Sequence, residues 1–528
     1  MDEHRQSSPE NLKIFPFARP FSCFRFSEQR FDGNPAIHRL FSLGRAFDAT
    51  TFVLESIAPA GLVALENKEI AALYPDYQCR ELVRLSFWRK AFTDPDDIAN
   101  LESPDLVGYA ILKHGDPHLG ASQCRPHGWH VFEAVFRKYQ HRHNCVPRPQ
   151  QFRVSVGGRR FCIPGVLYCQ QNQLNKACAH VALRSALARL LPDGDISYGH
   201  MNDFAREVAQ EEGESFVPCN GLSAKQMRRI FDASGVNYGD TDYEEEKENN
   251  ADIRKDVPYQ KFLYAGIESG CGGLLGFGMS GPRAGDGKHI IPFYGHTFNK
   301  DTWSPDADAH YFDIGGGVGY IPSESWTSSF IGHDDNFGAN FCVPRLYVRP
   351  ENVDYVVEFR HSEAMYGGAV AEAQALNFLS ALAPSLDHGN EWCARLRQYV
   401  DVQNLVLRAV CVPHNEYVTH LREMADWENN REDEALVNTI ANLMPNCLWI
   451  VEVSIPQLFP ANERKLGEVV LNAMRQRDDT KETDYGLFLF ARMPASFFVL
   501  KAANQYGRTF SPVESRIHSH VELITQSL

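Results

Sequence analysis

The sequence predicts an α+β protein built from three successive regions. At 528 residues the chain is too long for one hydrophobic core. Its content of 44% hydrophobic and 23% charged residues is typical of chains that fold over most of their length. Short apolar runs typical of strands are interspersed with runs of helical spacing. We therefore expect an N-terminal α+β region of unknown role at 1–160, a central α+β domain at 161–348 and a C-terminal α/β domain at 349–528.

Composition excludes several classes of function. The formal net charge of −15 argues against a nucleic-acid partner, because an acidic surface repels phosphate backbones. No apolar run approaches the roughly 18 residues that a membrane span needs, and the first residues lack the apolar core of a signal peptide. The 13 cysteines form no CxxC pair and are odd in number, which is typical of a reduced compartment. We expect a cytoplasmic protein without a membrane partner.

The N-terminal region carries strand and helix patterns but no catalytic motif. Strands are expected at 105–113 and 152–156, and a helix at 129–139. Cysteine and histidine also crowd one short span, and zinc binds such residues. Their spacing matches no zinc module, so we expect packing or solvated side chains and neither a metal nor a cofactor at Cys124, His127, His130, His141, His143 and Cys145.

The stretch 171–180, with sequence QNQLNKACAH, is the strongest candidate for a reactive site. Directly after Cys178 the apolar residues recur at spacings of three and four, which predicts a buried helix that ends near Pro192 and Gly194. Cys178 would then lie in the first helical turn, where free amides and the helix dipole stabilise a thiolate. The competing interpretation is an inert packing residue, since cysteine is among the most buried residue types.

The segment between this helix and 288 is expected to support the site. A helix is predicted near 201–210, and Ser223 with Gln226 forms a capping box for another. The acidic run 240–256 is expected to be a solvated loop, and 262–267 a strand. The glycines of 270–273 lack the lysine and serine of a phosphate-binding loop, so we assign them no ligand.

A histidine and an acid follow at strand ends. His289 opens an apolar strand and His296 closes it, seven positions later. Because an odd offset puts two side chains on opposite faces, only one can face the cysteine helix, and we favour His289. Asp334 and Asp335 then precede a glycine turn. The alternative role of Asp334 and Asp335 is turn formation. Three other residues lie closer to His289 in sequence and are rivals as the group that orients its ring: Asn299, Asp301 and Asp306.

This order of Gln, Cys, His and Asp resembles the papain-like cysteine peptidase superfamily, and within it the double-glycine leader peptidases and their relatives. The resemblance covers about 170–345. It implies a papain-like central domain in which Cys178 is the nucleophile, His289 the general base and acid, and an aspartate the group that orients His289. A glutamine would complete the oxyanion hole.

The sequence departs from the family pattern in three places. Ala179 replaces the glycine that follows the nucleophile. Gln173 and Gln171 lie five and seven positions before Cys178, whereas the family has its glutamine six before. We assign Gln173 to the oxyanion hole and keep Gln171 as the alternative. The family's Asp-Pro is replaced by Asp334-Asp335, and either could be the third member of the triad.

The C-terminal region alternates strand and helix patterns, which predicts an α/β domain for substrate or partner recognition. Strands are expected at 353–359, 405–412, 448–455 and 487–490, and helices at 369–382, 415–427, 434–443 and 462–474.

The sequence therefore predicts a cysteine hydrolase that cleaves a peptide or isopeptide amide, with no cofactor and a protein or peptide as substrate. The large flanking regions are typical of a peptidase regulated within a larger bacterial assembly by a protein partner. Two alternatives use the same fold: transglutaminase- or deamidase-type acyl transfer by the same triad, or a catalytically dead scaffold that binds a protein.

Overall fold

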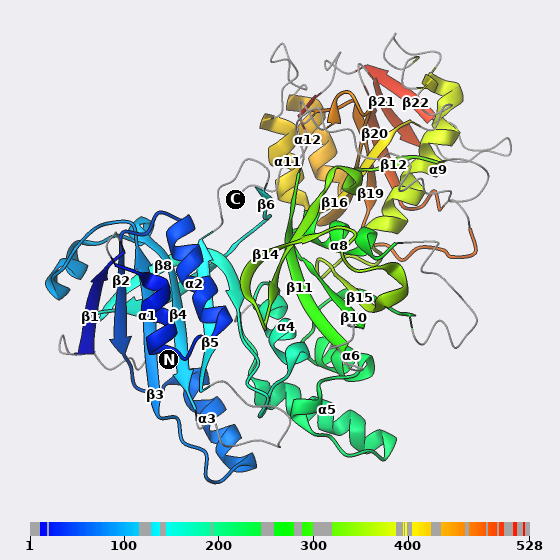
Figure 1. Ribbon diagram of the computed structural model, residues 1–528. Coiled ribbons are helices and arrows are strands. Elements are labelled where there is room, and N and C mark those ends of the chain that lie inside the picture. The colour runs from blue at the N-terminus through cyan, green and yellow to red at the C-terminus, as the bar shows by residue number, and fades with distance from the viewer. Residues whose placement is uncertain are drawn as a thin grey trace.

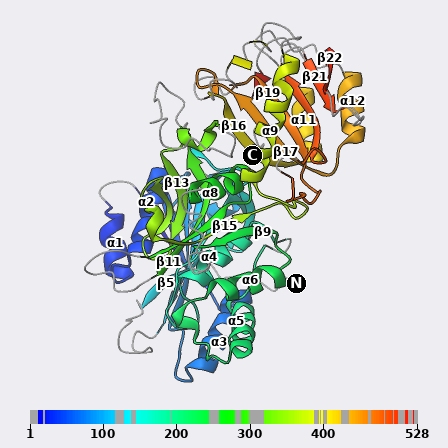
Figure 2. The same ribbon diagram turned by 90° about the vertical axis from the view of Figure 1, so that its right-hand side faces the viewer.

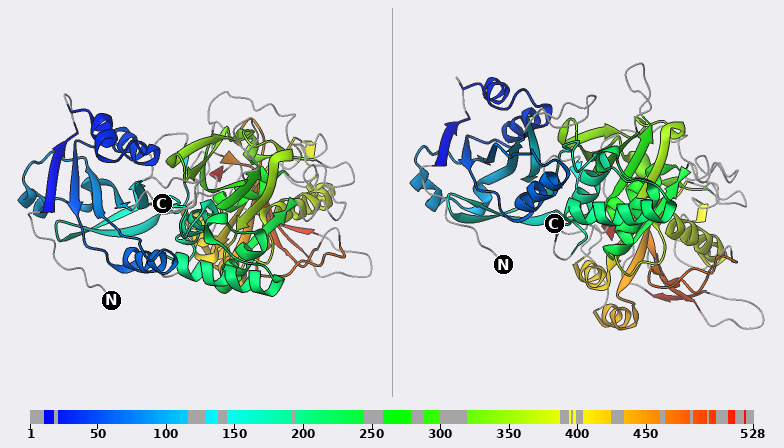
Figure 3. Two further views of the ribbon diagram at one scale, coloured as in Figure 1. Left: turned by 60° about the horizontal axis from the view of Figure 1, so that its bottom comes forward. Right: turned by 90° about the horizontal axis from the view of Figure 1, so that it is seen from below.

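The computed structural model contains both helices and sheets, as an α+β protein should. Within the described residues the strands form three sheets of seven strands and one small pair (Figure 1). The sheet that contains the 288–297 strand lies between the N-terminal and C-terminal sheets, and the views of Figures 2 and 3 agree on this order. The structure describes residues 11–17, 21–115, 128–137, 144–191, 194–243, 258–278, 288–298, 319–386, 394, 397–398, 404–423, 434–459, 464–481, 484–493, 496–500, 510–514 and 521–522.

The N-terminal sheet is antiparallel, and helices α1 (Cys23–Arg30) and α2 (Pro35–Ala46) cover one of its faces. Edge-on and tilted phenylalanine rings, among them Phe41, Phe52 and Phe87, fill that interface. Helix α3 (Gly61–Leu73) follows the second strand. In spatial order the strands are β1 (Leu12–Pro16), β2 (Thr51–Ser56), β3 (Glu81–Trp88), β4 (Leu106–His114), β5 (Trp129–Arg137), β8 (Arg159–Tyr168) and β7 (Gln150–Val156).

The helix predicted at 129–139 is wrong, because this stretch is strand β5 and pairs with β4 and β8. Both faces of β5 are buried: Val131 and Phe136 pack toward the α1–α2 side, and Phe132 and Val135 toward α4. A strand buried on both faces is a nearly continuous apolar run, which has no period of two and is easily mistaken for a helix.

The central sheet has helices on both faces. Helix α4 (Cys178–Leu187) packs on one face with Leu274 and Ile290, and α8 (Tyr259–Glu268) on the other with Leu275 and Ile291. Helices α5 (Tyr198–Glu212) and α6 (Ala224–Ala233) extend the α4 side. In spatial order the strands are β14 (Gly338–Pro344), β13 (Ser329–Asp334), β11 (Lys288–Thr297), β10 (Gly273–Gly278), β15 (Val353–Phe359) and β9 (Tyr238–Asp242), and β6 (Asn144–Cys145) pairs with the end of β11.

Local patterns predicted part of this sheet and missed another part. The capping box of α6 is confirmed: Gln226 N–H donates to Ser223 Oγ at 3.2 Å, and Ser223 N–H donates to Gln226 Oε1 at 2.9 Å. The strand predicted at 262–267 is wrong, because these residues belong to α8. That helix is buried nearly all round, so its sequence has no polar face to reveal the helical period. Strand β8 extends the N-terminal sheet to residue 168, and β15 belongs to the central sheet.

The C-terminal sheet is also covered on both faces. Helix α9 (Gly368–Leu386) packs on the face that contains Trp449, and α11 (His414–Glu423) and α12 (Glu434–Leu443) on the face that contains Ile450. In spatial order the strands are β12 (Ile321–Pro322), β16 (Val406–Pro413), β17 (Cys447–Ser454), β19 (Gly467–Asn472), β20 (Phe488–Met493), β21 (Ser496–Leu500) and β22 (Phe510–Glu514).

The helix predicted at 462–474 is wrong, because its described part forms β18 (Arg464–Lys465) and β19, and β18 pairs with β23 (Val521–Glu522). Strand β19 runs in the interior of the sheet and is buried on both faces, which again hides the strand period. Among the helices of the described chain, none combines the length and the apolar character that a membrane crossing requires.

Candidate active site

Cys178 is the first residue of α4, as the sequence predicts. Ala177 before it is extended, with φ −110° and ψ −174°, so the helix begins abruptly. Cys178 is partly exposed, whereas every residue from Ala179 to Leu187 is buried. The first amides of a helix have no intrahelical partner and carry the positive end of the dipole, so this position favours negative charge on the sulfur.

The loop before Cys178 is held by its own polar side chains. Asn172 Oδ1 accepts the backbone N–H groups of Leu174 at 2.9 Å and Asn175 at 3.2 Å. Gln173 lies inside this turn with a backbone φ of +56°, a left-handed conformation that residues other than glycine rarely adopt. The turn therefore fixes the path of the chain into the helix.

His180 caps the helix rather than acting as the base. Its Nδ1 accepts the N–H of Ala177 at 3.2 Å, and its Nε2 lies 2.9 Å from Asn202 Oδ1. Burial lowers the pKa of His180 to about 4, although the hydrogen bond to Asn202 opposes this shift. A neutral imidazole fits a capping acceptor.

Lys176 ties the loop that precedes Cys178 to the N-terminal region. Its Nζ is fully buried and lies 2.7 Å from Glu66 Oε1 of α3, and Glu66 Oε2 also contacts Lys113 of β4. Burial alone would raise the pKa of Glu66, but the two ammonium groups lower it below its ordinary value. Glu66 is therefore a carboxylate held between two buried cations, one of them two residues from Cys178.

The N-terminal region also holds the strands that carry the acids. The Arg39 guanidinium of α2 donates to the carbonyl oxygens of Ala339 at 3.1 Å and Asn340 at 2.6 Å, at the start of β14. The Tyr168 hydroxyl at the end of β8 donates to the backbone carbonyl of Asp335 at 3.3 Å. One region thus contacts both the cysteine side and the acid side of the site.

His289 lies on β11 next to Cys178, and its ring is 7% exposed. Its Nε2 is 3.3 Å from Asp334 Oδ2 and 3.5 Å from Asp335 Oδ1, and His289 lines the same cavity as Cys178. Burial would lower the pKa of His289, but the hydrogen bonds to Asp334 and Cys178 and the two nearby carboxylates raise it to about 10. This environment favours an imidazolium. His296, on the same strand, contacts Glu268 of α8 instead.

The two acids differ in their hydrogen bonds. Asp334 Oδ1 accepts the N–H groups of Asn336 at 2.9 Å and Phe337 at 3.1 Å, which leaves Oδ2 for His289. Burial raises the pKa of Asp334, but the bonds to His289 and the two amides outweigh it and lower the pKa. Burial raises the pKa of Asp335 to about 7, and neither of its carboxyl oxygens has a hydrogen-bond partner of good geometry. Asp334 is therefore the better-ordered carboxylate.

The two candidate glutamines lie in different surroundings. The Gln171 side-chain amide donates to Asn336 Oδ1 at 3.0 Å, so it connects the loop that precedes Cys178 to the turn that follows Asp334 and Asp335. Gln173 Oε1 is buried and has no hydrogen-bond partner among the described residues. Several residues considered from the sequence lie outside the described residues. They are the rivals of Asp334 and Asp335, namely Asn299, Asp301 and Asp306, and four members of the cysteine–histidine cluster, namely Cys124, His127, His141 and His143.

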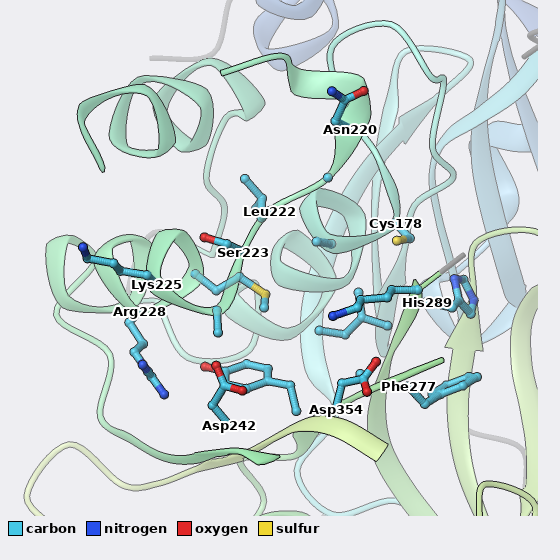
Figure 4. Close-up of a pocket in the computed structure, with 18 of the residues that line it drawn as sticks. Cys178, Asn220, Leu222, Ser223, Lys225, Arg228, Asp242, Phe277, His289 and Asp354 are labelled. Atoms are coloured by element: carbon cyan, nitrogen blue, oxygen red, sulfur yellow. The ribbon is translucent and has the colours of Figure 1, made fainter. Parts of the chain in front are cut away.

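Cys178 and His289 line one cavity of about 660 Å³, a size typical of ligand sites. Figure 4 shows the two side chains at one end, with Lys225, Arg228 and Asp242 at the other. The walls come from the start of α4, the segment 220–228 and strands β10, β11 and β15. Besides these residues the lining includes Ala179, Glu212, Glu214, Asn220, Gly221, Leu222, Ser223, Ala224, Met227, Gly276, Phe277, Lys288, Ile290, Asp354 and Tyr355.

Two groups of described residues have metal-ligand atoms within 4.8 Å of one another: His289 with Asp334 and Asp335, and Cys145 with Glu268 and His296. In both, the histidine Nε2 already contacts a carboxylate. These are the contacts of an ion-paired histidine, and we assign no metal to either group.

Several residues that build the site could not be found from the sequence. Glu66, Lys113 and Arg39 act through contacts with segments far along the chain, and no motif connects them to Cys178. Asn172 is the exception, because an Asx turn before a helix is a local pattern.

The chain was compared with family models, curated proteins and solved structures, and none of them matches it.

Glu66→Gln should destabilise the protein and disturb the nucleophile loop. The substitution leaves two buried ammonium groups without a counter-charge. Removal of one partner of a buried ion pair typically lowers the free energy of unfolding by about 3–5 kcal/mol. Chemical denaturation measures the loss, and Glu207→Gln, which removes an exposed partner of Arg229, is the matched control and should cost under about 1 kcal/mol. Equal effects of the two substitutions would show that Glu66 does not anchor the loop.

Asp335→Asn should gain stability relative to the natural protein as the pH rises from about 4 to 8. A folded-state pKa of about 7 lies above the unfolded value of about 3.9. Between these two values Asp335 is ionised in the unfolded chain and protonated in the folded one, so the natural protein loses stability as the pH rises. The gain should be about 4 kcal/mol above pH 7, since the pKa differs by about 3 units and each unit is worth about 1.4 kcal/mol. Unfolding curves of both proteins across the window measure it. Asp334→Asn should show no such gain, and parallel curves for Asp335→Asn would contradict the assignment.

Proposed function

We propose that the protein is a cysteine hydrolase that cleaves a peptide or isopeptide amide, with Cys178, His289 and Asp334 as its triad. The observation that supports this most is the arrangement around His289: it lines the same cavity as the Cys178 thiol, and its Nε2 lies 3.3 Å from Asp334 Oδ2. A nucleophile, a base and a third group that orients the base are what acyl transfer through a thiol requires. The cavity beside them offers room for a substrate.

In this mechanism the Cys178 thiolate and the His289 imidazolium form the resting ion pair. The sulfur attacks the carbonyl carbon of the substrate, and the Cys178 backbone N–H at the start of α4 stabilises the oxyanion. Loss of one such donor typically costs about 3 kcal/mol of barrier. Gln173, or Gln171 in its place, would supply the second donor. His289 then protonates the leaving amine, and water, deprotonated by His289, releases the acyl group.

The two carboxyl groups divide their roles in this proposal. Asp334, with its second oxygen fixed by two backbone amides, orients the His289 ring and stabilises its charge. Asp335, whose pKa is about 7, carries a proton for much of the time near neutral pH. Protonation of Asp335 removes one of the negative charges that raise the pKa of His289, which makes it easier for the ring to give up its proton.

We infer a protein or peptide substrate from the resemblance, and a regulating protein partner from the large flanking regions. Charged residues of both signs line the cavity beyond the reacting pair, which suits a peptide chain with polar side chains better than an apolar ligand.

Site-resolved alkylation should separate a live site from a dead scaffold. With iodoacetamide at about pH 6, Cys178 should react at least about tenfold faster than the exposed Cys162, Cys219 and Cys342, because only a thiolate reacts readily. His289→Gln should abolish this advantage, and His200→Ala, an exposed histidine of α5, should not. Mass spectrometry of the labelled peptides measures each rate. If Cys178 reacts no faster than Cys162 at this pH, the hydrolase proposal fails.

Activity itself can be tested on a complex mixture of peptides. The natural chain should generate new peptide termini that incorporate ¹⁸O from labelled water, and Cys178→Ala should generate none. Asp334→Asn should lower the rate at least about tenfold by misorienting the histidine. Incorporation of an added primary amine in place of ¹⁸O would assign acyl transfer instead. Products that persist in Cys178→Ala would refute the role of this cysteine.

A further inference from the structure

Cys145 forms a second cysteine–histidine–carboxylate group, on the opposite side of the central sheet from Cys178. It lies on β6, which pairs with the end of β11 so that Cys145 stands directly opposite His296. Directly opposed residues of an antiparallel pair point to the same side of the sheet, and the Cys145 sulfur, a His296 ring nitrogen and a Glu268 carboxylate oxygen lie within 4.8 Å of one another. Cys145 is partly exposed, whereas His296 is 1% exposed.

The His296 ring is held from several elements. Its Nε2 forms a short hydrogen bond with Glu268 at the end of α8. Its Nδ1 lies 3.1 Å from the Thr297 carbonyl oxygen and 3.3 Å from Thr327 Oγ1. The Tyr264 ring of α8 packs 4.9 Å from it, centroid to centroid. The titratable groups that face His296 are therefore Cys145, Glu268 and Tyr264.

Glu268 is in turn fixed by the C-terminal region. The Arg408 guanidinium of β16 donates to Glu268 Oε2 at 3.0 Å through its Nε, which leaves Oε1 for His296. Burial would raise the pKa of Glu268, but Arg408 and His296 lower it to about 2. Glu268 is therefore ionised and favours a protonated His296. Burial would lower the pKa of His296, but Cys145 and Glu268 raise it to about 10.

We propose that Cys145 is a second reactive thiolate of the protein, held by His296 and Glu268, and that it is a site of oxidative modification by small hydroperoxides. The argument rests on the geometry of a partly exposed thiol against a buried imidazole whose other contacts are a carboxylate and hydrogen-bond acceptors. It does not depend on the proposed hydrolase activity. No cavity large enough for a peptide is needed, because a hydroperoxide is about the size of two water molecules.

The proposed step is a two-electron oxidation of the sulfur by hydrogen peroxide. The Cys145 thiolate attacks one peroxide oxygen, an S–O bond forms, and the O–O bond breaks. The departing hydroxide takes the proton of the His296 imidazolium and leaves as water. The products are the sulfenic acid of Cys145, neutral His296 and water, so sulfur is oxidised while peroxide is reduced.

The other cysteines make this proposal easy to distinguish from simple accessibility. Cys162, Cys219 and Cys342 are all more exposed than Cys145. If access alone governed oxidation, these three would react first. If thiolate character governs it, Cys145 reacts first although it is less exposed.

The experiment uses the full-length Cys178→Ser chain, so that the proposed catalytic thiol cannot contribute. Hydrogen peroxide is added at about pH 6.5, sulfenic acid is trapped with dimedone, and each cysteine is quantified by mass spectrometry. Cys145 should be trapped at least about tenfold faster than Cys162, Cys219 and Cys342, since an ordinary thiol is scarcely ionised at this pH. Addition of His296→Gln to this chain should reduce the trapping rate of Cys145 to the rates of the three exposed cysteines.

A pH series keeps the test decisive if His296→Gln does not fold. In the Cys178→Ser chain the trapping rate of Cys145 should stay nearly constant from about pH 8 to 6, whereas an unassisted thiol loses about tenfold per pH unit below its pKa. A Cys145 rate that falls in parallel with that of Cys162, or that stays below the rates of the three exposed cysteines throughout, would overturn the proposal.

Discussion

The site depends on a carboxylate buried between two lysines. Glu66 of α3 neutralises Lys113 of β4 and Lys176 of the loop that precedes Cys178, and all three side chains are at most 2% exposed. A buried charge without a partner costs several kcal/mol, so the loop can reach its folded path only when the N-terminal region is in place. The turn of Asn172, the cap of His180 and the abrupt start of α4 at Cys178 all follow from that path.

Strand β11 carries two buried histidines in different environments. His289 lines the cavity beside Cys178 and contacts Asp334, whereas His296 contacts Glu268 of α8. In each case a carboxylate next to a buried imidazole offsets the desolvation of its charged form. The acids differ in what fixes them: backbone amides of a tight turn hold Asp334, whereas the guanidinium of Arg408 holds Glu268. The first arrangement is local, and the second joins two regions of the chain.

Local patterns in the sequence predict the elements that local interactions determine. The start of α4, the capping box of α6 and strand β15 could be found because a helix cap or a strand run is written in neighbouring residues. Strands β5 and β19 and helix α8 were misassigned because each is buried almost all round, so that its apolar period disappears. The contact of His289 with both Asp334 and Asp335 could be anticipated from order along the chain, but the difference between the two acids depends on burial. Glu66 and Arg39 could not be found, since their effect requires a fold that brings distant segments together.

The resting state of His289 is the most direct test of this account. Selective ¹⁵N and ¹³C labelling of histidine, with His289→Gln to assign its resonance, allows its ring to be titrated by NMR from about pH 5 to 10. The account predicts an imidazolium that persists well above pH 7, in line with a pKa of about 10, and an earlier loss of the proton when Cys178→Ser removes the negative sulfur. A His289 ring that titrates near its ordinary pKa of about 6.5 and does not respond to Cys178→Ser would contradict the ion pair on which the proposed chemistry rests.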